Sequence, residues 1–270
     1  MSHLAPKPPE PVRVTTLGDL LLDVIVHLEG PLVVGDDRPA TTRACAGGQA
    51  ANVAAWASVS GATARYVGKR GDDEAGEIVE HELAGYGVTV AGPRVGRTGI
   101  VVSIAESADR SMASDRGSAP DLAPDELTRD WFDSDVFFIS GYALMRQPIG
   151  AAAMRAAQLA RSFGATVALD LATWTLFDDT FRERVQQLAP DLVFANEREH
   201  DEFGEFDCRW IVKRGANGVL VDGVAYPALP TSVVDPTGAG DAFAGGFLAG
   251  GVTLGLDAAA RCCAKLGAMP

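Results

Sequence analysis

Cysteine and histidine are scarce in this sequence. Its 270 residues include four of each, and neither type recurs at the short spacings that bring zinc ligands together. We therefore expect the cysteines to be structural or surface residues rather than metal ligands. Free cysteines without a disulfide pattern also favour a reducing location, the cytoplasm.

Positive charge is also in short supply. The chain has 23 Lys and Arg against 36 Asp and Glu, a formal net charge of −13. A field this acidic argues against a general nucleic-acid surface and against an anionic membrane as partner. Long apolar runs are missing as well, and the polar, proline-rich start has no apolar stretch of the kind found in signal peptides. We expect a cytoplasmic protein with neither nucleic acid nor membrane as a partner, and a disordered tail over residues 1–11.

Hydrophobic residues, by contrast, make up 47% of the chain, enough to form the core of one large domain over residues 12–270. Strand-like and helix-like runs alternate, which predicts crossover connections and a mostly parallel sheet in an α/β fold. The strands are expected at residues 12–17, 63–67, 136–140, 166–170, 191–195, 210–213, 219–221 and 224–226. The helices are expected at residues 49–60, 73–85 and 148–163.

Two stretches, residues 22–45 and 96–117, break this alternation. Both are typical of strands without intervening helices, and the second contains two runs joined by a polar turn at residues 108–109. We expect these strands to be inserted into the α/β domain as a small separate sheet.

The segment DPTGAGDAFAGGF, residues 235–247, carries the strongest chemical signal. Gly238 and Gly240 permit a tight turn, and the apolar run behind them predicts a helix whose first N–H groups have no partner within the helix. Such a helix start binds phosphate, so the backbone from Gly238 through Ala239 and Gly240 to Asp241 can form an anion hole. We expect the helix dipole to favour the ionised form of Asp241, which can then accept a proton from a hydroxyl group.

A second glycine pair precedes another apolar helix. Gly47 and Gly48 allow a small ligand to approach the backbone closely. Asn52 lies one turn into that helix and can both donate and accept hydrogen bonds. This arrangement suits a small hydroxylated molecule.

Together the two segments resemble the ribokinase or PfkB family of carbohydrate kinases. The shorter segments GDLLLD, VGKRGDDEAG, NERE and VKRGANG agree with it too, so the resemblance covers nearly the whole chain from residue 12 onward. It implies a ribokinase-like three-layer α/β/α sandwich, with ATP and Mg²⁺ as cofactors and a small sugar as substrate. In that family the inserted strands form a lid over the sugar and often a dimer clasp, which implies a homodimer.

Asn196 and Glu199 follow an expected strand. An amide and a carboxylate one turn apart at a helix start can hold Mg²⁺ through water and orient phosphates. The same spacing is also that of a capping box, in which the two residues bond only to each other's backbone. Beside the other motifs, we favour the metal role.

The resemblance implies roles for further residues. It implies that Asp23 binds two adjacent sugar hydroxyls, and that Lys213 and Gly215 face the nucleotide. It also implies that Asp235 and Thr237 help to form a monovalent cation site, for K⁺, beside the glycine turn.

Arg116 and Tyr142 are open to two interpretations each. Arg116 either holds a carboxylate or phosphate of the substrate or is a solvated loop cation. Tyr142 follows a strand end, where open α/β sheets place their ligands, and either stacks on a sugar or base or packs at the rim.

These features predict transfer of the γ-phosphate of MgATP to a hydroxyl group, most simply a primary one, of a small sugar, with Asp241 as the base. The alternatives are a 2-keto-3-deoxy sugar acid kinase that uses Arg116, a nucleoside kinase that uses Tyr142, and a sugar-sensing protein without catalysis. The stretch between Asn196 and Trp210 and the one after Asp241 are short for this family, so we expect that adenine is held loosely, that the site is less selective for its donor, or that another subunit completes the wall of the nucleotide pocket.

Overall fold

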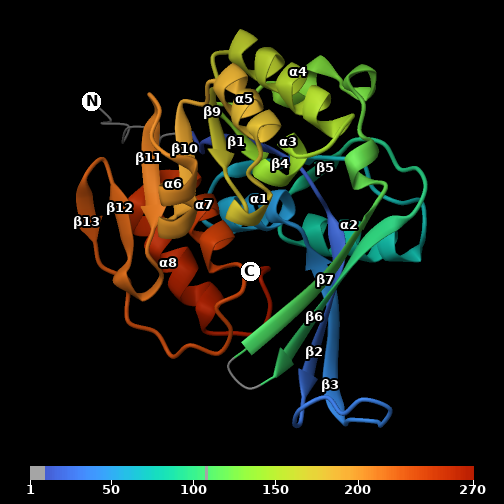
Figure 1. Cartoon of the computed structure of the whole chain (residues 1–270). Helices are drawn as coiled ribbons and strands as arrows, with labels where there is room; N and C mark the ends of the chain where they lie inside the picture. The colour runs from blue at the N-terminus through green and yellow to red at the C-terminus, as the bar shows by residue number, and fades with distance from the viewer. Residues whose placement is uncertain (1–9, 107–108) are drawn as a thin grey trace, which may run out of the picture.

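A nine-stranded sheet forms the centre of the molecule (Figure 1). The computed structural model describes residues 10–106 and 109–270. The strand order is β13-β12-β11-β10-β9-β8-β1-β4-β5; neighbours from β5 to β11 run parallel, whereas β12 and β13 are antiparallel. The strands are β1 (Arg13–Leu17), β4 (Thr63–Val67), β5 (Thr89–Ala91), β8 (Val136–Ser140), β9 (Thr166–Asp170), β10 (Leu192–Asn196), β11 (Arg209–Lys213), β12 (Val219–Val221) and β13 (Val224–Tyr226).

Helices cover both faces of this sheet. Adjacent residues of a strand point to opposite faces, and Phe137 and Phe138 accordingly lie in different hydrophobic clusters. One face packs against α1 (Gln49–Val59), α2 (Glu74–Gly85), α7 (Ala239–Gly250) and α8 (Val252–Cys263). The other packs against α3 (Gly141–Leu144), α4 (Ile149–Ser162), α5 (Asp179–Leu188) and α6 (Glu197–Phe203). The expected three-layer α/β/α sandwich is confirmed.

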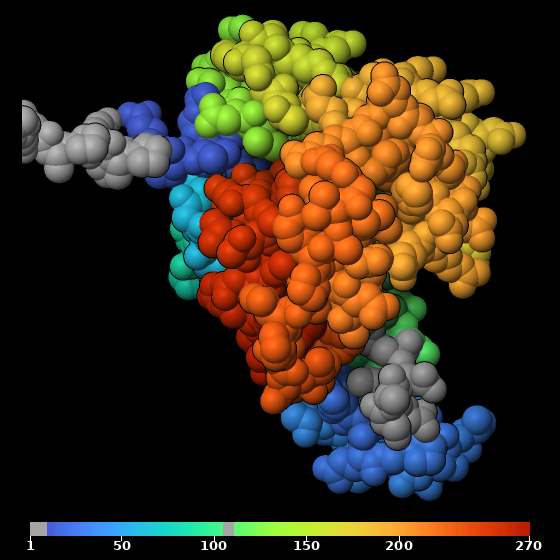
Figure 2. Space-filling model, turned by 90° about the vertical axis from the view of Figure 1, so that its left-hand side faces the viewer, coloured from blue at the N-terminus to red at the C-terminus, as the bar shows by residue number. Residues whose placement is uncertain are grey.

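A second, four-stranded sheet extends from this body. Its order is β3-β2-β6-β7, with β2 and β6 parallel and both outer pairs antiparallel. The strands are β2 (Leu21–Leu28), β3 (Ala40–Gly47), β6 (Thr98–Glu106) and β7 (Asp109–Gly117). Figures 1 and 2 show β2 and β3 projecting beyond the main body. The expected inserted strands therefore form a separate sheet.

Most expected elements are present, with small shifts at their ends. Helix α2 begins one residue late because Asp73 is its cap, and Asp73 Oδ1 accepts from the Gly76 N–H at 2.8 Å. Residues 1–9 of the expected tail and Ala108 of the expected turn lie outside the described residues. Within the described ranges, every helix is too short or too polar to cross a bilayer.

Candidate active site

The two glycine-rich segments meet at the starts of α1 and α7. Asn52 Nδ2 donates a hydrogen bond to Asp241 Oδ2 at 2.8 Å, although the two residues lie 189 positions apart. In the described part of the chain, the buried Asn52 Oδ1 has no hydrogen-bond partner. An orphaned acceptor is costly unless a donor reaches it. The Asn52 side chain thus joins both segments and, within the described residues, keeps its own amide oxygen unpaired.

The start of α1 needs glycine at two consecutive positions. Gly48 caps the helix with φ of 102°, and a Cβ there would overlap the carbonyl of Asp19. A Cβ on Gly47 would overlap the carboxylate of Asp23. The glycine pair therefore brings the Asp23 carboxylate against the backbone that leads to Asn52.

The start of α7 is a tight turn at Gly238. Its φ is 76°, and a Cβ there would overlap Ala268. The N–H of Ala239 donates to the Pro236 carbonyl at 3.2 Å, so this member of the expected anion hole is used within the turn. The N–H groups of Gly240 and Asp241 belong to the first helical turn, where the helix offers no acceptor.

Burial sets the protonation of Asp241. It raises the pKa of this carboxyl to about 6, while the hydrogen bond from Asn52 opposes the rise. The negative charge of Asp170 raises the pKa further, and Lys213 and a hydrogen bond from Gln49 lower it. Burial thus outweighs the favourable contacts, yet a pKa of about 6 still leaves the carboxylate largely ionised at neutral pH.

Asp170 and Lys213 form a buried ion pair beside Asp241. Lys213 Nζ lies 2.6 Å from Asp170 Oδ2, and the two side chains are 17% and 2% exposed. Burial lowers the pKa of Lys213, but the charges of Asp170 and Glu199 outweigh it, so the pKa is raised and the ammonium stays charged. The sequence analysis did not identify Asp170 as a site residue. The feature that could have identified it is its place at the carboxyl end of a buried parallel strand, because such sheets bind ligands at that edge.

Asn196 and Glu199 form the capping box considered above. Asn196 Oδ1 accepts from the Glu199 N–H, and Glu199 Oε2 accepts from the Asn196 N–H, both at 2.8 Å. Burial and the charge of Asp170 raise the pKa of Glu199. Residues 10–106 and 109–270 hold no cluster of three or more His, Cys, Asp or Glu arranged to bind a metal. A metal at Glu199 would therefore keep much of its water shell, as Mg²⁺ commonly does.

Asp235 braces the glycine turn. Its Oδ1 accepts from the Thr237 N–H at 2.9 Å and from the Thr237 hydroxyl. Its Oδ2 accepts from the Gly267 N–H at 3.1 Å. These bonds tie the turn to the segment that contains Ala268, against which Gly238 packs.

Arg116 reaches the site from β7 of the small sheet. Its guanidinium lies 4.0 Å from the centre of the Tyr142 ring and pairs with the buried Asp19. Burial lowers the pKa of Arg116. Burial raises the pKa of Tyr142, the charge of Arg116 opposes that rise, and the charges of Asp241 and Asp170 add to it. Of the two interpretations of Arg116, the solvated loop cation is excluded.

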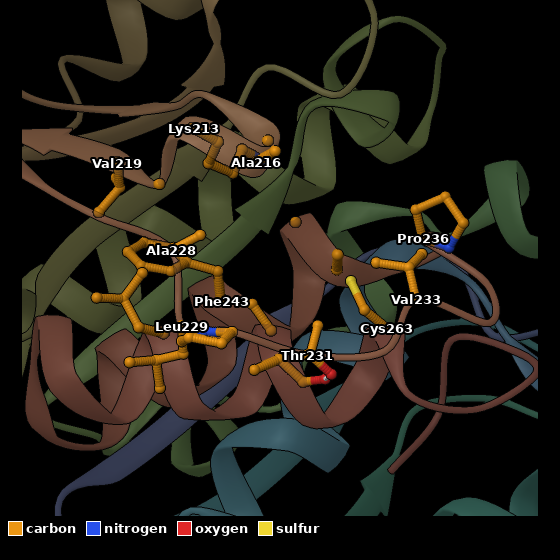
Figure 3. Close-up of a pocket in the computed structure, with 18 residues that line it drawn as sticks. Lys213, Ala216, Val219, Ala228, Leu229, Thr231, Val233, Pro236, Phe243 and Cys263 are labelled. Carbon is orange, nitrogen blue, oxygen red and sulfur yellow. Dashed lines mark hydrogen bonds between the residues drawn. The ribbon is translucent and has the colours of Figure 1, made fainter.

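An apolar cavity of about 540 Å³ is lined by α7, α8 and the loop at residues 228–236 (Figure 3). Phe243, Leu229 and Cys263 lie around it, and Lys213 lies at its edge. Gly215, at φ of 55°, also lines it.

Comparison with known proteins agrees with this arrangement. The model of the pfkB family of carbohydrate kinases matches residues 13–269. The chain is 30% identical over 264 residues to the ATP-dependent ribose-1-phosphate kinase of Halopiger xanaduensis, covering 90% of this chain and 86% of that protein. The crystal structure of adenosine kinase from Sinorhizobium meliloti superimposes with a TM-score of 0.84 at 26% identity, over 96% of both chains. A putative ribokinase II from E. coli in complex with ATP and Mg²⁺ has the same fold, with a TM-score of 0.80 at 21% identity over 96% of this chain and 94% of that one.

Proposed function

The chain belongs to the pfkB family of carbohydrate kinases, and we propose that it transfers the γ-phosphate of ATP to a primary hydroxyl group of a small sugar. The hydrogen bond between Asn52 and Asp241 carries this proposal. It joins a helix start suited to a hydroxylated ligand to one suited to a phosphate, and in-line transfer needs these two groups side by side.

Asp241 is the general base in this reaction. A pKa of about 6 leaves most of the carboxylate ionised at neutral pH yet able to take up a proton, which is the balance that a general base needs. It accepts the proton of the sugar hydroxyl as the oxygen attacks. The backbone at Gly238, Gly240 and Asp241 stabilises the negative charge of the phosphoryl group in transit. Ala239, which we expected to contribute its N–H group, instead shapes the turn through its bond to Pro236.

The donor nucleotide fits the apolar cavity. Its volume is typical of pockets for molecules of this size, and Gly215 and Lys213 at its edge place the nucleotide's phosphates beside Gly240. When bound, Mg²⁺ would offset the charge of those phosphates. Glu199 and Asn196 would hold that ion through water.

We also propose a site for a monovalent cation such as K⁺. Asp235 and Thr237 would help to hold it beside the turn that they already brace. Replacing K⁺ with tetramethylammonium would then lower turnover while leaving the fold unchanged by circular dichroism. Equal activity in both salts contradicts the site.

The use of ATP as the phosphate donor also agrees with a cytoplasmic location for this protein.

The acceptor lies between the small sheet and α1. Asp23 accepts hydrogen bonds from adjacent sugar hydroxyls, and the orphaned oxygen of Asn52 accepts another. Gly47 and Gly48 let the sugar approach the backbone closely. Closure of the small sheet over this site would exclude water, which otherwise competes as a phosphate acceptor.

A negatively charged sugar, such as a 2-keto-3-deoxy sugar acid, is a second candidate acceptor. Arg116 favours it, because its guanidinium is held at the site rather than in solvent. A nucleoside is less favoured, because Arg116 covers one face of the Tyr142 ring on which a base would stack. Release of ADP with MgATP and a panel of pentoses, hexoses, sugar acids, sugar phosphates and nucleosides separates these acceptors.

Asp241→Asn tests the kinase mechanism. We expect turnover to fall by roughly 10²–10⁴-fold, the usual contribution of a general base, with little change in ligand affinity. Asp257→Asn, at an exposed position of α8, is the matched control. Turnover of Asp241→Asn within about threefold of wild type would remove Asp241 from the role of base. If wild type and variant both lack turnover while a sugar raises the melting temperature, the protein is a sensor instead.

The small sheet is also proposed to join two copies of the chain. Its strands carry Ile100 on one face and Met112 on the other, at 38% and 52% exposure, and the sheet ends in two outer strands, β3 and β7, whose edges a second copy could cover. Light scattering at high protein concentration should give the mass of a homodimer. A monomer under those conditions contradicts the proposal.

A further inference from the structure

The ion pair between Lys213 and Asp170 crosses one strand of the main sheet. Lys213 ends β11 and Asp170 ends β9, with β10 between them. The ammonium lies 2.6 Å from the Asp170 carboxylate. It also lies 3.2 Å from the position that a Cβ on Gly240 would occupy, so it lies next to the glycine turn. Lys213 therefore bridges the edge of the cavity and the start of α7.

The backbone that follows Asp170 fixes its carboxylate. Asp170 Oδ1 accepts from the Ala172 N–H at 3.0 Å. Ala172 has a φ of 70°, in the left-handed region that a residue with a Cβ adopts at a cost of roughly 1–2 kcal/mol. Strain of this kind persists only where surrounding contacts enforce it, and it is common at functional sites. The turn at Ala172 thus aims the Asp170 carboxylate at Lys213.

Lys213 has two competing anionic neighbours. Asp241 and Glu199 both interact with its charge, and both have roles of their own in the proposed reaction. A lysine side chain is flexible and would move toward whichever anion is best placed. A lysine paired with Asp241 would be turned away from the phosphates and would weaken the base.

Building on the proposed kinase function, we propose that Asp170 is a positioning residue that holds the Lys213 ammonium beside Gly240, where it meets the donor's phosphates, and away from Asp241 and Glu199. Asp170 itself touches no atom of the donor. Its contribution to nucleotide binding passes entirely through Lys213.

Calorimetric titration of a non-hydrolysable ATP analogue and of adenosine tests this proposal without requiring a known acceptor. We expect Lys213→Met to weaken binding of the analogue by roughly 10–100-fold, as for a lost hydrogen bond to a charged group, and to leave adenosine binding unchanged. Asp170→Asn should give a similar loss in the wild-type background. In the Lys213→Met background, Asp170→Asn should change the affinity by less than about twofold, because contributions that act through one residue are not additive.

Three results would overturn the proposal. The first is that Asp170→Asn binds the analogue as tightly as wild type does. The second is that a variant loses as much affinity for adenosine as for the analogue. The third is that the two losses of affinity multiply in the double variant, as a general structural defect would produce. Asp222→Asn, which breaks an exposed aspartate–arginine pair far along the sheet, is the control and should bind both ligands as wild type does.

Asp170→Glu is the second variant, in case Asp170→Asn does not fold. It keeps the charge but shifts the carboxylate by one methylene, so we expect weaker binding of the analogue and unchanged binding of adenosine. If Asp170→Glu binds the analogue as tightly as wild type does, the positioning role is contradicted. If wild type binds neither ligand, this proposal and the kinase proposal both fail. If it binds nucleotide but phosphorylates no acceptor, only the kinase proposal fails, and the variants still decide the role of Asp170.

Discussion

The two ends of the candidate site are built differently. The walls of the cavity proposed for the nucleotide come from one stretch of chain, Lys213 to Cys263, and are mostly apolar. The acceptor end is assembled from distant segments and is charged: Asp19 and Asp23 lie around the start of β2, and Arg116, 97 positions after Asp19, lies at the end of β7 and pairs with Asp19. Apolar walls recognise a ligand by shape and burial, whereas fixed charges recognise particular groups at particular positions.

This contrast assigns selectivity to the acceptor end and general affinity to the donor end. Changes at the acceptor end should alter which acceptor reacts, and changes in the cavity should alter only how tightly the nucleotide binds. Asp241 lies where the two ends meet and should affect both. Four experiments can break or sharpen this division.

The largest effect is expected on the stability of the protein when Asp241, which lies between the two ends, is replaced. The pKa of Asp241 is about 6 in the folded protein and lower when unfolded, so the folded state binds the proton more tightly. Ionisation then costs stability as the pH rises from about 4 through about 6. Asp241→Asn should therefore raise the free energy of unfolding at pH 8 by up to about 3 kcal/mol, and the gain should vanish near pH 4. Urea unfolding at both pH values measures this; a gain that is equal at both would show that ionisation is not its source.

At the acceptor end, Arg116→Met should lower kcat/KM for the best acceptor by roughly 100-fold if that acceptor is anionic, through loss of a charged hydrogen bond. The KM for ATP should stay within about threefold of wild type. Arg97→Met removes an exposed arginine that pairs with Asp115 and serves as the control. Because Arg116→Met also leaves the buried Asp19 without its cation, Arg116→Met/Asp19→Asn separates recognition from destabilisation. An equal loss for neutral and anionic acceptors would contradict the division.

In the donor cavity, Ala259→Phe should raise the KM for ATP by roughly tenfold, because the ring fills space that the nucleotide needs. The KM for the acceptor should be unchanged. Thr253→Phe adds the same ring at an exposed position of the same helix and should leave both constants as they are. A shift in acceptor preference for Ala259→Phe would mean that the two ends are not independent.

The smallest effect is expected at Ala172. Replacing it with glycine removes the strain of a Cβ at φ of 70° and should stabilise the protein by about 1 kcal/mol in urea unfolding. If that turn aims Asp170, the more flexible glycine should also weaken binding of the ATP analogue slightly. Ala189 has a φ of 46° at the end of α5, away from the site, so Ala189→Gly should stabilise the protein without any effect on binding.

Local constraints made much of this molecule predictable from its sequence. The glycines at 47, 48 and 238 stand where a Cβ would overlap a neighbour, and the helices behind them follow from the apolar runs. The order of strands and helices also followed from local patterns, so the α/β class and the parallel sheet could be expected. The family resemblance supplied what local patterns do not, including the candidate roles of Asp23 and of the small sheet.

Contacts between distant residues were the part that the sequence did not reveal. Asp170 and Lys213 meet across a strand, and Asp19 meets Arg116 between segments 97 positions apart, so no spacing in the chain marks either pair. The raised pKa of Asp241 depends on burial by several elements at once. Loop residues 228–236 line the apolar cavity together with α8, and no spacing in the chain indicates that these segments meet.

The turn at Gly238 rests on residues that come later in the chain, since Ala268 packs against it and the Gly267 N–H bonds to Asp235. Translation delivers α7 and α8 before this support exists, and domains form only as their parts emerge from the ribosome. A nascent chain that ends before Gly267 would contain both glycine-rich motifs but would lack the two contacts that hold the turn at Gly238 in place.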